Sequence, residues 1–426
     1  MQDGRSTARF VSGAPYRTIG EERILELLLL HGWVHAVRAG ARETAMAEAR
    51  AALEKWVHLG LGFAARGNER SFDPAEVVNF CKWAGLRGED ACWRERFVPN
   101  GRRLVLEQHG IAKDAGAAPD PSALAPARFN FELSRSFNLD AFEPGTSIRL
   151  RLPLPLEEDA NRNLNIRHSA APDVPVAFTP LPGRLDVRLS VPRERTITVT
   201  IQFDVLAEPF RHFRSALTRS ERELYLRSAE GLMRITPRLS ALAQDLAGNA
   251  HEDLEIVRRF WHFLLTRLAC GTVHYDALDP RAALDTVLES GWFDCQLGSA
   301  LIVALCRARG IPARLAAGYL LYPASPFHHY WAEAWVDGGW FPLDSIASDL
   351  SAFGQDSGWR DGFFGSLDYR VKTQSLPHSF DASPSLRFPA RWGSLSRLHD
   401  AGMETAYLET ESRALIYRDR IVAAKA

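Results

Sequence analysis

The sequence predicts an α+β fold in which helical and strand-rich regions follow one another along the chain. Three patterns indicate this class: helical spacing of apolar residues before residue 112, apolar–polar alternation over 128–207, and a mixture of both afterwards. A Pro- and Ala-rich stretch between the first two regions has linker composition. We expect a helical N-terminal region at 1–112, a linker at 113–127, a small antiparallel β-sandwich-like domain at 128–208, and an α+β domain with a C-terminal extension at 209–426.

The first two regions carry packing patterns and no cluster of reactive side chains. Leu25, Leu28 and Leu29 recur at helical spacing, and Asp73 before Pro74 indicates another helix start. In the middle region, runs such as 129–133 and 196–201 alternate between apolar and polar residues, with Pro and Gly at the turns. This alternation predicts two-faced strands that pack over a common core.

Cys295 is the most informative residue, because it stands at the start of an apolar helix. Asp294 is a typical N-cap, and apolar residues recur at helical spacing from Leu297 until Pro312 ends the element. The first N–H groups of a helix are unpaired and carry partial positive charge, which favours the nucleophilic thiolate. Both faces of this helix are apolar, so we expect it to be buried and to hold the thiol in a fixed place.

A strand that begins near His329 follows the helix. Its alternation places His329, Trp331 and Glu333 on one face. His328 falls on the other face, where we expect a structural or substrate-facing role. Glu333 is expected to form an ion pair with Arg314 of the adjacent strand rather than to transfer protons.

The next strand brings a carboxylate to the same face. Asp337-Gly338-Gly339 is a strong hairpin signal, and a two-residue turn there sets Asp344 opposite Trp331 or Glu333. Either register puts Asp344 on the face of His329, where it can orient the imidazole and stabilise the imidazolium. An ordered Cys, His and Asp set is what a thiol acyl-transfer site requires.

Together these blocks resemble the transglutaminase-like superfamily. The resemblance covers about residues 220–350 and rests on separated motifs in a fixed order. Besides the cysteine at a helix start, they are Arg-Ala-Arg-Gly-Ile-Pro-Ala-Arg at 307–314, His-x-Trp-x-Glu at 329–333 and Gly-Trp-x-x-x-Asp at 339–344.

The resemblance implies a papain-like core, in which a helix bearing the nucleophile packs on an antiparallel sheet, and makes 209–426 the catalytic domain. It implies that Cys295 is the nucleophile, His329 the base and Asp344 the orienting acid. It also implies an oxyanion hole that includes the backbone N–H of Cys295. Our candidates for further oxyanion or substrate contacts are Trp292, Gln296 and Trp331.

The implied function is acyl transfer or hydrolysis at an amide or thioester carbonyl through a Cys295 acyl-enzyme, as in an amidase, a peptidase or an amide-forming transferase. The alternative is a binding or assembly module whose thiol no longer reacts. Animal transglutaminases carry Gly-Gln-Cys-Trp where this chain has Phe-Asp-Cys-Gln at 293–296, and no acidic loop resembles a calcium site. Calcium activation is therefore not expected, and fold resemblance does not choose among these chemistries.

The composition of the chain limits the kinds of metal, partner and compartment that we expect. A zinc site would also use Cys, His and Asp, but the sequence has no Cys-x-x-Cys or His-Glu-x-x-His, so we expect neither metal nor other cofactor. With 51 basic and 52 acidic residues, the charge argues against nucleic-acid and membrane partners. Five cysteines and a segment Met1–Arg17 without an apolar core favour a cytoplasmic protein. The expected partners are an amide, peptide or acyl-thioester substrate and an amine acceptor.

Overall fold

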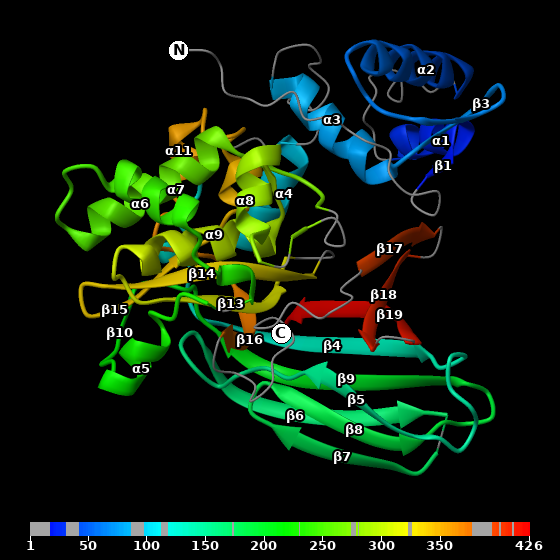
Figure 1. Cartoon of the computed structure of the whole chain (residues 1–426). Coiled ribbons are helices and arrows are strands. Elements are labelled where there is room, and N and C mark those ends of the chain that lie inside the picture. Colours follow the sequence, from blue (N-terminus) through cyan, green and yellow to red (C-terminus); the bar gives the residue numbers. More distant parts are fainter. Residues whose placement is uncertain are drawn as a thin grey trace.

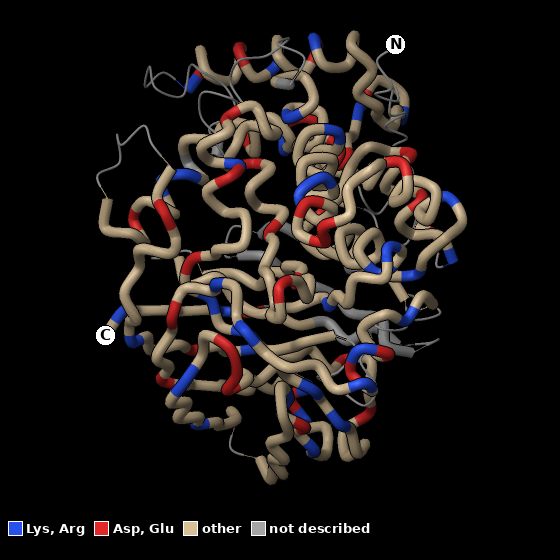
Figure 2. The backbone as a smooth tube through the Cα atoms, turned by 90° about the vertical axis from the view of Figure 1, so that its left-hand side faces the viewer, with Lys and Arg blue, Asp and Glu red and all other residues tan. Residues whose placement is uncertain are grey.

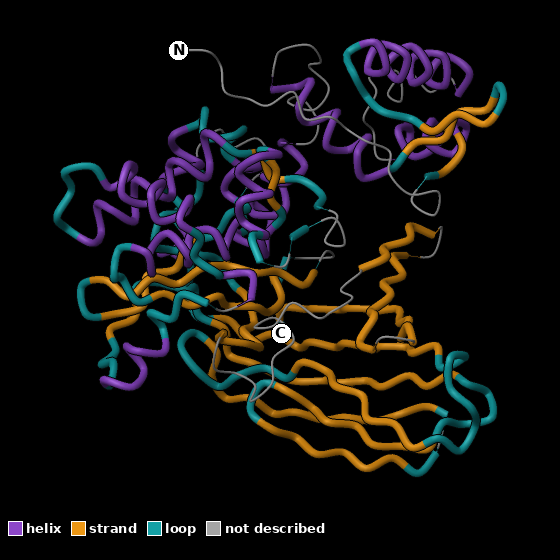
Figure 3. The backbone as a smooth tube through the Cα atoms, in the orientation of Figure 1, coloured by secondary structure: helices purple, strands orange, loops and turns teal. Residues whose placement is uncertain are grey.

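The computed structural model describes residues 18–30, 42–86, 98–111, 118–172, 174–229, 231–273, 278–279, 281–322, 326–376, 394–399, 402–410 and 413–426. Met1–Arg17, where the sequence predicts no signal peptide, and residues 112–117 of the expected linker lie outside the described residues. The described residues mix helices and strands, which confirms the predicted α+β class. In Figures 1 and 3, helices gather on one side of a central sheet and a larger group of strands on the other.

The N-terminal region is a helical unit with a small sheet. Its strands, in the order β1-β3-β2, are two to four residues long, too short to show as alternation in the sequence. Leu28, Trp56 and Phe80 lie in its buried core, and Asp73 accepts a hydrogen bond from the N–H of Ala75 at 2.9 Å. The elements are β1 (Ile19–Gly20), α1 (Glu21–Leu30), α2 (Arg42–His58), β2 (Ala64–Arg66), β3 (Glu69–Phe72), α3 (Pro74–Leu86) and α4 (Val98–His109).

Two antiparallel sheets form a β-sandwich below the centre of the molecule (Figure 1). The larger sheet has the order β17-β18-β19-β4-β9-β6, and the smaller one β5-β8-β7. Apolar side chains alternate inward along β4 and β9 and share one buried cluster with those of β5 and β8. The strands are β4 (Ala127–Asn138), β5 (Ser147–Pro153), β6 (Asn161–Ala171), β7 (Val176–Leu181), β8 (Arg184–Ser190), β9 (Thr196–Ala207), β17 (Ser394–His399), β18 (Gly402–Thr410) and β19 (Arg413–Lys425).

The C-terminal strand completes the larger sheet of this sandwich. β19 pairs with β4 from Ile416 opposite Asn138 to Lys425 opposite Phe129. Arg135 of β4 and Asp419 of β19 add an ion pair at 2.6 Å across 284 residues of sequence. The structure therefore differs from the expected division, which places the whole C-terminal extension with the α+β domain. A pairing over such a sequence distance leaves no local pattern from which it could be predicted.

A five-stranded antiparallel sheet, in the order β10-β15-β14-β13-β16, lies at the centre of the molecule. On one face α9 packs against β13 and β14, with α6 and α7 against the other side of α9 (Figure 1). The sheet also packs on the sandwich, where the rings of Tyr319 and Phe131 lie 5.0 Å apart and those of Tyr369 and Phe129 lie 5.2 Å apart. The site residues are therefore held between two hydrophobic layers.

The elements of this central part follow one another closely. α9 is buried along nearly its whole length, as its two apolar faces predict. The strands are β10 (Phe213–Arg214), β11 (Ala269–Cys270), β12 (Trp292–Phe293), β13 (Ala313–Leu320), β14 (Phe327–Val336), β15 (Gly339–Leu343) and β16 (Arg370–Leu376). The helices are α5 (Arg219–Leu224), α6 (Pro237–Ala247), α7 (Asp253–Arg267), α8 (Ala283–Ser290), α9 (Cys295–Ala308), α10 (Ala347–Leu350) and α11 (Ser357–Asp361).

Gly318 allows β13 and β16 to approach closely, because a Cβ atom at this position would fall on the Val371 carbonyl oxygen. Gly318→Ala is expected to lower the free energy of unfolding by about 1–3 kcal/mol, since a sheet packed on both faces cannot easily shift. Chemical denaturation measures this loss. Gly20→Ala is the control, because nothing lies within 4 Å of a Cβ atom placed there. Equal losses in the two variants would contradict the close approach.

Candidate active site

Cys295 is the first residue of α9, and Asp294 caps that helix as the sequence predicts. The Asp294 backbone is extended, and its carboxylate accepts a hydrogen bond from the N–H of Leu297 at 2.8 Å. Cys295 is partly exposed, whereas the residues that follow it in α9 are buried. The thiol therefore stands on a rigid element and remains accessible.

The segment before Cys295 is held by the N-terminal region. β11 and β12 pair in parallel, and the N–H of Gly271 donates to the Phe293 carbonyl at 2.7 Å. From α3, the Asn79 side chain bonds both the N–H and the carbonyl of Thr272, at 2.7 and 2.8 Å. Lys82 of the same helix donates to the Cys270 carbonyl at 2.9 Å. Helix α3 thus supports the strand pair that leads into Cys295.

The hairpin of β14 and β15 brings His329 and Asp344 together. Asp337 and Gly338 both have positive φ, at 48° and 74°, and Val336 pairs with Gly339, which confirms the predicted two-residue turn. Ala332 pairs with Leu343, so the next residue of the hairpin, Asp344, lies across from Trp331. The Nε2 atom of His329 lies 2.7 Å from Oδ1 of Asp344.

The His329 imidazole interacts with Cys295 as well as with Asp344. Burial disfavours the imidazolium, but the charges of Asp344 and Cys295 outweigh it and raise the pKa of His329 to about 10. Because Nε2 faces Asp344, Nδ1 is the nitrogen left for the sulfur. The imidazole is thus cationic at neutral pH.

Asp344 is fully buried and remains an anion. Burial alone would raise the pKa of this carboxyl group, but the charges of His329 and Arg370 and a bond from the backbone N–H of Ile346 hold it well below its usual range. Arg370 of β16 donates through Nη1 to Oδ2 of Asp344 at 2.7 Å. Arg370 carries no distinctive local signal, because it stands in the alternating run Leu-Asp-Tyr-Arg-Val-Lys at 367–372.

A model of the transglutaminase-like superfamily matches residues 240–345, the segment that contains Cys295, His329 and Asp344. This segment is a transglutaminase-like domain. No curated protein matches the chain.

Several solved structures are similar to the chain at low identity. A candidate cysteine protease from Cytophaga hutchinsonii is 14% identical with a TM-score of 0.48, over 71% of this chain and 91% of its own. The periplasmic domain of TgpA from Pseudomonas aeruginosa is 17% identical with a TM-score of 0.31, over 56% and 94% of the two chains. A candidate protease from Parabacteroides distasonis is 15% identical with a TM-score of 0.24, over 46% and 43%.

Within the transglutaminase-like domain, the three further candidates lie in different surroundings. Gln296 follows Cys295 on α9 and is buried. Trp292 lies three residues before Cys295 in β12, where its ring packs beside Gly271. Trp331 is fully buried, and its indole N–H donates to Glu333 at 2.9 Å. The indole N–H of Trp331 therefore donates to a partner within the core of the domain.

The predicted ion pair between Glu333 and Arg314 is confirmed, with 2.6 Å between Oε2 and Nε. His328 lies on the sandwich side of the sheet, where its ring packs against Tyr319 at 5.4 Å. Its side chain is exposed, whereas that of His329 is buried.

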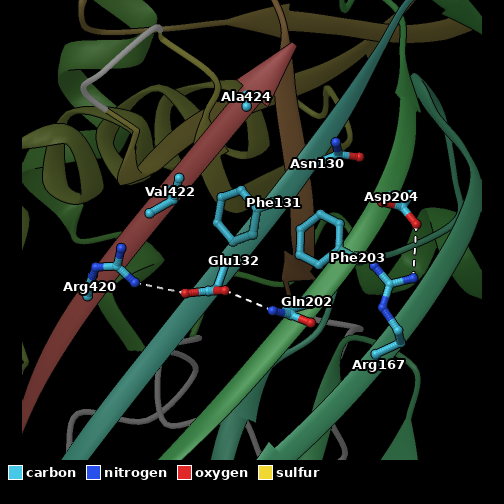
Figure 4. Close-up of a pocket in the computed structure, with 10 residues that line it drawn as sticks. All are labelled: Asn130, Phe131, Glu132, Arg167, Gln202, Phe203, Asp204, Arg420, Val422 and Ala424. Carbon is cyan, nitrogen blue, oxygen red and sulfur yellow. Dashed lines mark hydrogen bonds and ion pairs between the residues drawn. The ribbon is translucent and has the colours of Figure 1, made fainter. Parts of the chain in front are cut away.

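Other features of the surface lie away from this site. A hollow of about 450 Å³ opens on the larger sheet of the sandwich (Figure 4), where Glu132 bonds Arg420 and Gln202, and Arg167 bonds Asp204. Acidic and basic residues are interspersed over the chain in Figure 2. In the described part of the chain, no group of His, Cys, Asp and Glu could hold a metal ion, and no helix is long and apolar enough to cross a membrane.

Asp344→Asn is expected to lower the pKa of His329 from about 10 by roughly 1–3 units, because the charge that favours the imidazolium is removed. An NMR titration of the His329 ring measures the change. Asp361→Asn is the matched control, since Asp361 lies 3.4 Å from the ring of His262 at the surface of the same half of the chain. A His329 titration that is the same in wild type and Asp344→Asn would refute the assigned cause.

Proposed function

We propose that the transglutaminase-like domain catalyses acyl transfer or hydrolysis at an amide, peptide or thioester carbonyl through a covalent acyl-enzyme on Cys295. One observation supports the proposal: Nε2 of His329 lies 2.7 Å from Asp344, and the charge of Cys295 contributes to the raised pKa of His329, which puts the thiol close to the ring. This is the arrangement that activates a thiol nucleophile and returns its proton to a leaving group.

In the first half of the reaction, the Cys295 sulfur attacks the carbonyl carbon while His329 holds the thiol proton. A carbon–sulfur bond forms and the carbonyl oxygen becomes an oxyanion. As the bond to the leaving amine or thiol breaks, the imidazolium gives its proton to that group. The product is a thioester on Cys295, and Asp344 keeps the ring in one orientation throughout.

In the second half, water or an amine takes the place of the first leaving group. His329 removes its proton as it attacks the thioester, and the Cys295 sulfur leaves and regains the ion pair with the imidazolium. Water yields an acid and an amine yields a new amide. Both acceptors use the same three side chains, so the acceptor is decided by what the cleft admits.

The start of α9 supplies a donor for the oxyanion. A backbone N–H at the first position of a helix has no acceptor within the helix, and the Asp294 carboxylate caps Leu297 instead of Cys295. We assign the N–H of Cys295 to the oxyanion, where a preorganised donor contributes to catalysis. Gln296 and Trp292, its neighbours in sequence, are the side chains that would supplement it.

A covalent intermediate on Cys295 is expected to be trapped and detected by intact-mass spectrometry. The protein is mixed with a pooled library of amides and thioesters, and a mass gain equal to an acyl group is expected on the wild type and not on Cys295→Ala. Cys306→Ala is the matched control, because Cys306 lies on the same helix but is fully buried. It is expected to form the same adduct as the wild type.

The mass of the adduct names the acyl donor, and the released product separates hydrolysis from transfer to an amine. Adducts on Cys295→Ala equal to those on the wild type would sink the proposal. A wild type that forms no adduct with any donor would instead favour a binding or assembly module with an inert thiol.

A further inference from the structure

The two oxygens of the Asp344 carboxylate have separate partners. Oδ1 lies 2.7 Å from Nε2 of His329 and accepts from the N–H of Ile346 at 2.8 Å, while Oδ2 accepts from Nη1 of Arg370 at 2.7 Å. A carboxylate bonded at both oxygens cannot rotate freely. Its orientation, and with it the orientation of the His329 ring, is therefore fixed from the side that faces away from Cys295.

Arg370 has further partners besides Asp344. Its Nη2 donates to Oδ1 of Asp368 at 2.9 Å, and its guanidinium lies 5.0 Å from the centre of the Trp331 ring. Arg370, Asp368 and Asp344 are all fully buried. Apolar residues of similar volume often stabilise a buried position as well as an ion pair does, so this triad suggests a role beyond stability.

The backbone of Arg370 is held by the sandwich. The side chain of Asn161, at the start of β6, donates to the Arg370 carbonyl at 2.8 Å and accepts from the N–H of Lys372 at 2.7 Å. β16 is an edge strand of the central sheet. The Asn161 side chain bonds backbone groups of this edge that a neighbouring strand would otherwise pair with. Lys372 also reaches back to Asp159, at 2.6 Å. The sandwich thus holds the strand that carries Arg370.

We propose that Arg370 is a positioning residue for the Cys295 reaction, acting through Asp344 on His329, and that Asn161 holds it in register. The inference rests on the proposed function and deepens it. Arg370 favours the ionised form of Asp344, and Asp344 in turn favours the imidazolium that activates the thiol. Without Arg370, two buried carboxylates would share one site, and one of them would bind a proton at higher pH than it does now.

Other titratable groups face this cluster and remain in every variant considered. Tyr322, which follows β13, interacts with Asp368 and Arg370, and burial raises the pKa of its hydroxyl well above the usual value. His109 of α4 interacts with Asp368, while burial lowers the pKa of its ring. Both groups are present in wild type and in every variant, so a difference between the proteins reports the change at Arg370.

The test is the pH dependence of Cys295 alkylation by iodoacetamide, followed by peptide mass spectrometry from pH 4 to 9. Arg370→Met/Asp368→Asn removes one positive and one negative charge and so preserves the net charge of the cluster. In this variant Asp344 is held less firmly and orients the His329 imidazolium less well, so the Cys295 thiolate is protonated at higher pH; the acid limb is expected to move to higher pH by about 1 unit, a roughly tenfold lower rate on that limb. Arg370→Lys retains the positive charge but not the forked geometry of the guanidinium. Its acid limb is expected to lie between that of the wild type and that of the double variant.

Folding is controlled separately. Circular dichroism identifies the variants that fold. Asn161→Ala perturbs Arg370 only through its backbone, so we expect the acid limb to shift in the same direction by a smaller amount. Gln202→Ala is the matched control, since Gln202 of the sandwich bonds Glu132 and does not bond β16. It is expected to leave the limb in place.

The outcomes separate the two proposals. A wild-type Cys295 that is alkylated no faster than a free thiol overturns both. A reactive wild type whose acid limb is unchanged in the folded Arg370 variants, whatever they lose in thermal stability, overturns the positioning role and leaves the proposed function standing.

Discussion

The buried negative charge of Asp344 is the interaction on which the rest of the site depends. Burying a carboxylate is costly unless cations and hydrogen-bond donors compensate it. Here His329, Arg370 and the N–H of Ile346 do so, at 2.7 to 2.8 Å. Burial by itself would favour a neutral imidazole at His329, and the Asp344 charge reverses that preference. The reactivity that we assign to Cys295 therefore depends on Asp344, which is far from Cys295 in the sequence and does not lie on α9.

The central sheet lies between α9 and the sandwich and contacts both. It carries His329 and Asp344 close to the start of α9, and Tyr319 packs its ring against Phe131 of the sandwich. Charged side chains cross between the layers as well, because Arg314 bonds both Glu333 of the sheet and Asp159 of the sandwich. The sandwich is thus connected to the site by specific polar contacts in addition to hydrophobic packing.

Local patterns in the sequence were sufficient to predict several parts of this arrangement. The Asp294 cap, the turn at Asp337 and Gly338, and the pairing of Glu333 with Arg314 each depend on neighbouring or hairpin-linked residues. In such cases helical or strand periodicity determines which side chains face one another. The expected division of the chain failed at its C-terminus for the opposite reason, because β19 returns to β4 from the far end of the sequence.

Arg370 and Asn161 show the same limit within the site. Each is an ordinary polar residue in a strand pattern, and its role arises only from contact with a segment 26 or 209 residues away. Three short N-terminal strands were missed because two to four residues cannot establish a period. Residues with chemically distinctive side chains and fixed local spacing were predictable, whereas residues that support them through long-range contacts were not.

The central claim is that the sulfur of Cys295 and the ring of His329 share a proton. It is tested most directly by the rate at which iodoacetamide alkylates Cys295 at neutral pH in wild type and in His329→Ala, measured in folded protein. The account predicts a wild-type rate severalfold higher, because the imidazolium favours the thiolate. Equal rates in the two proteins would contradict it.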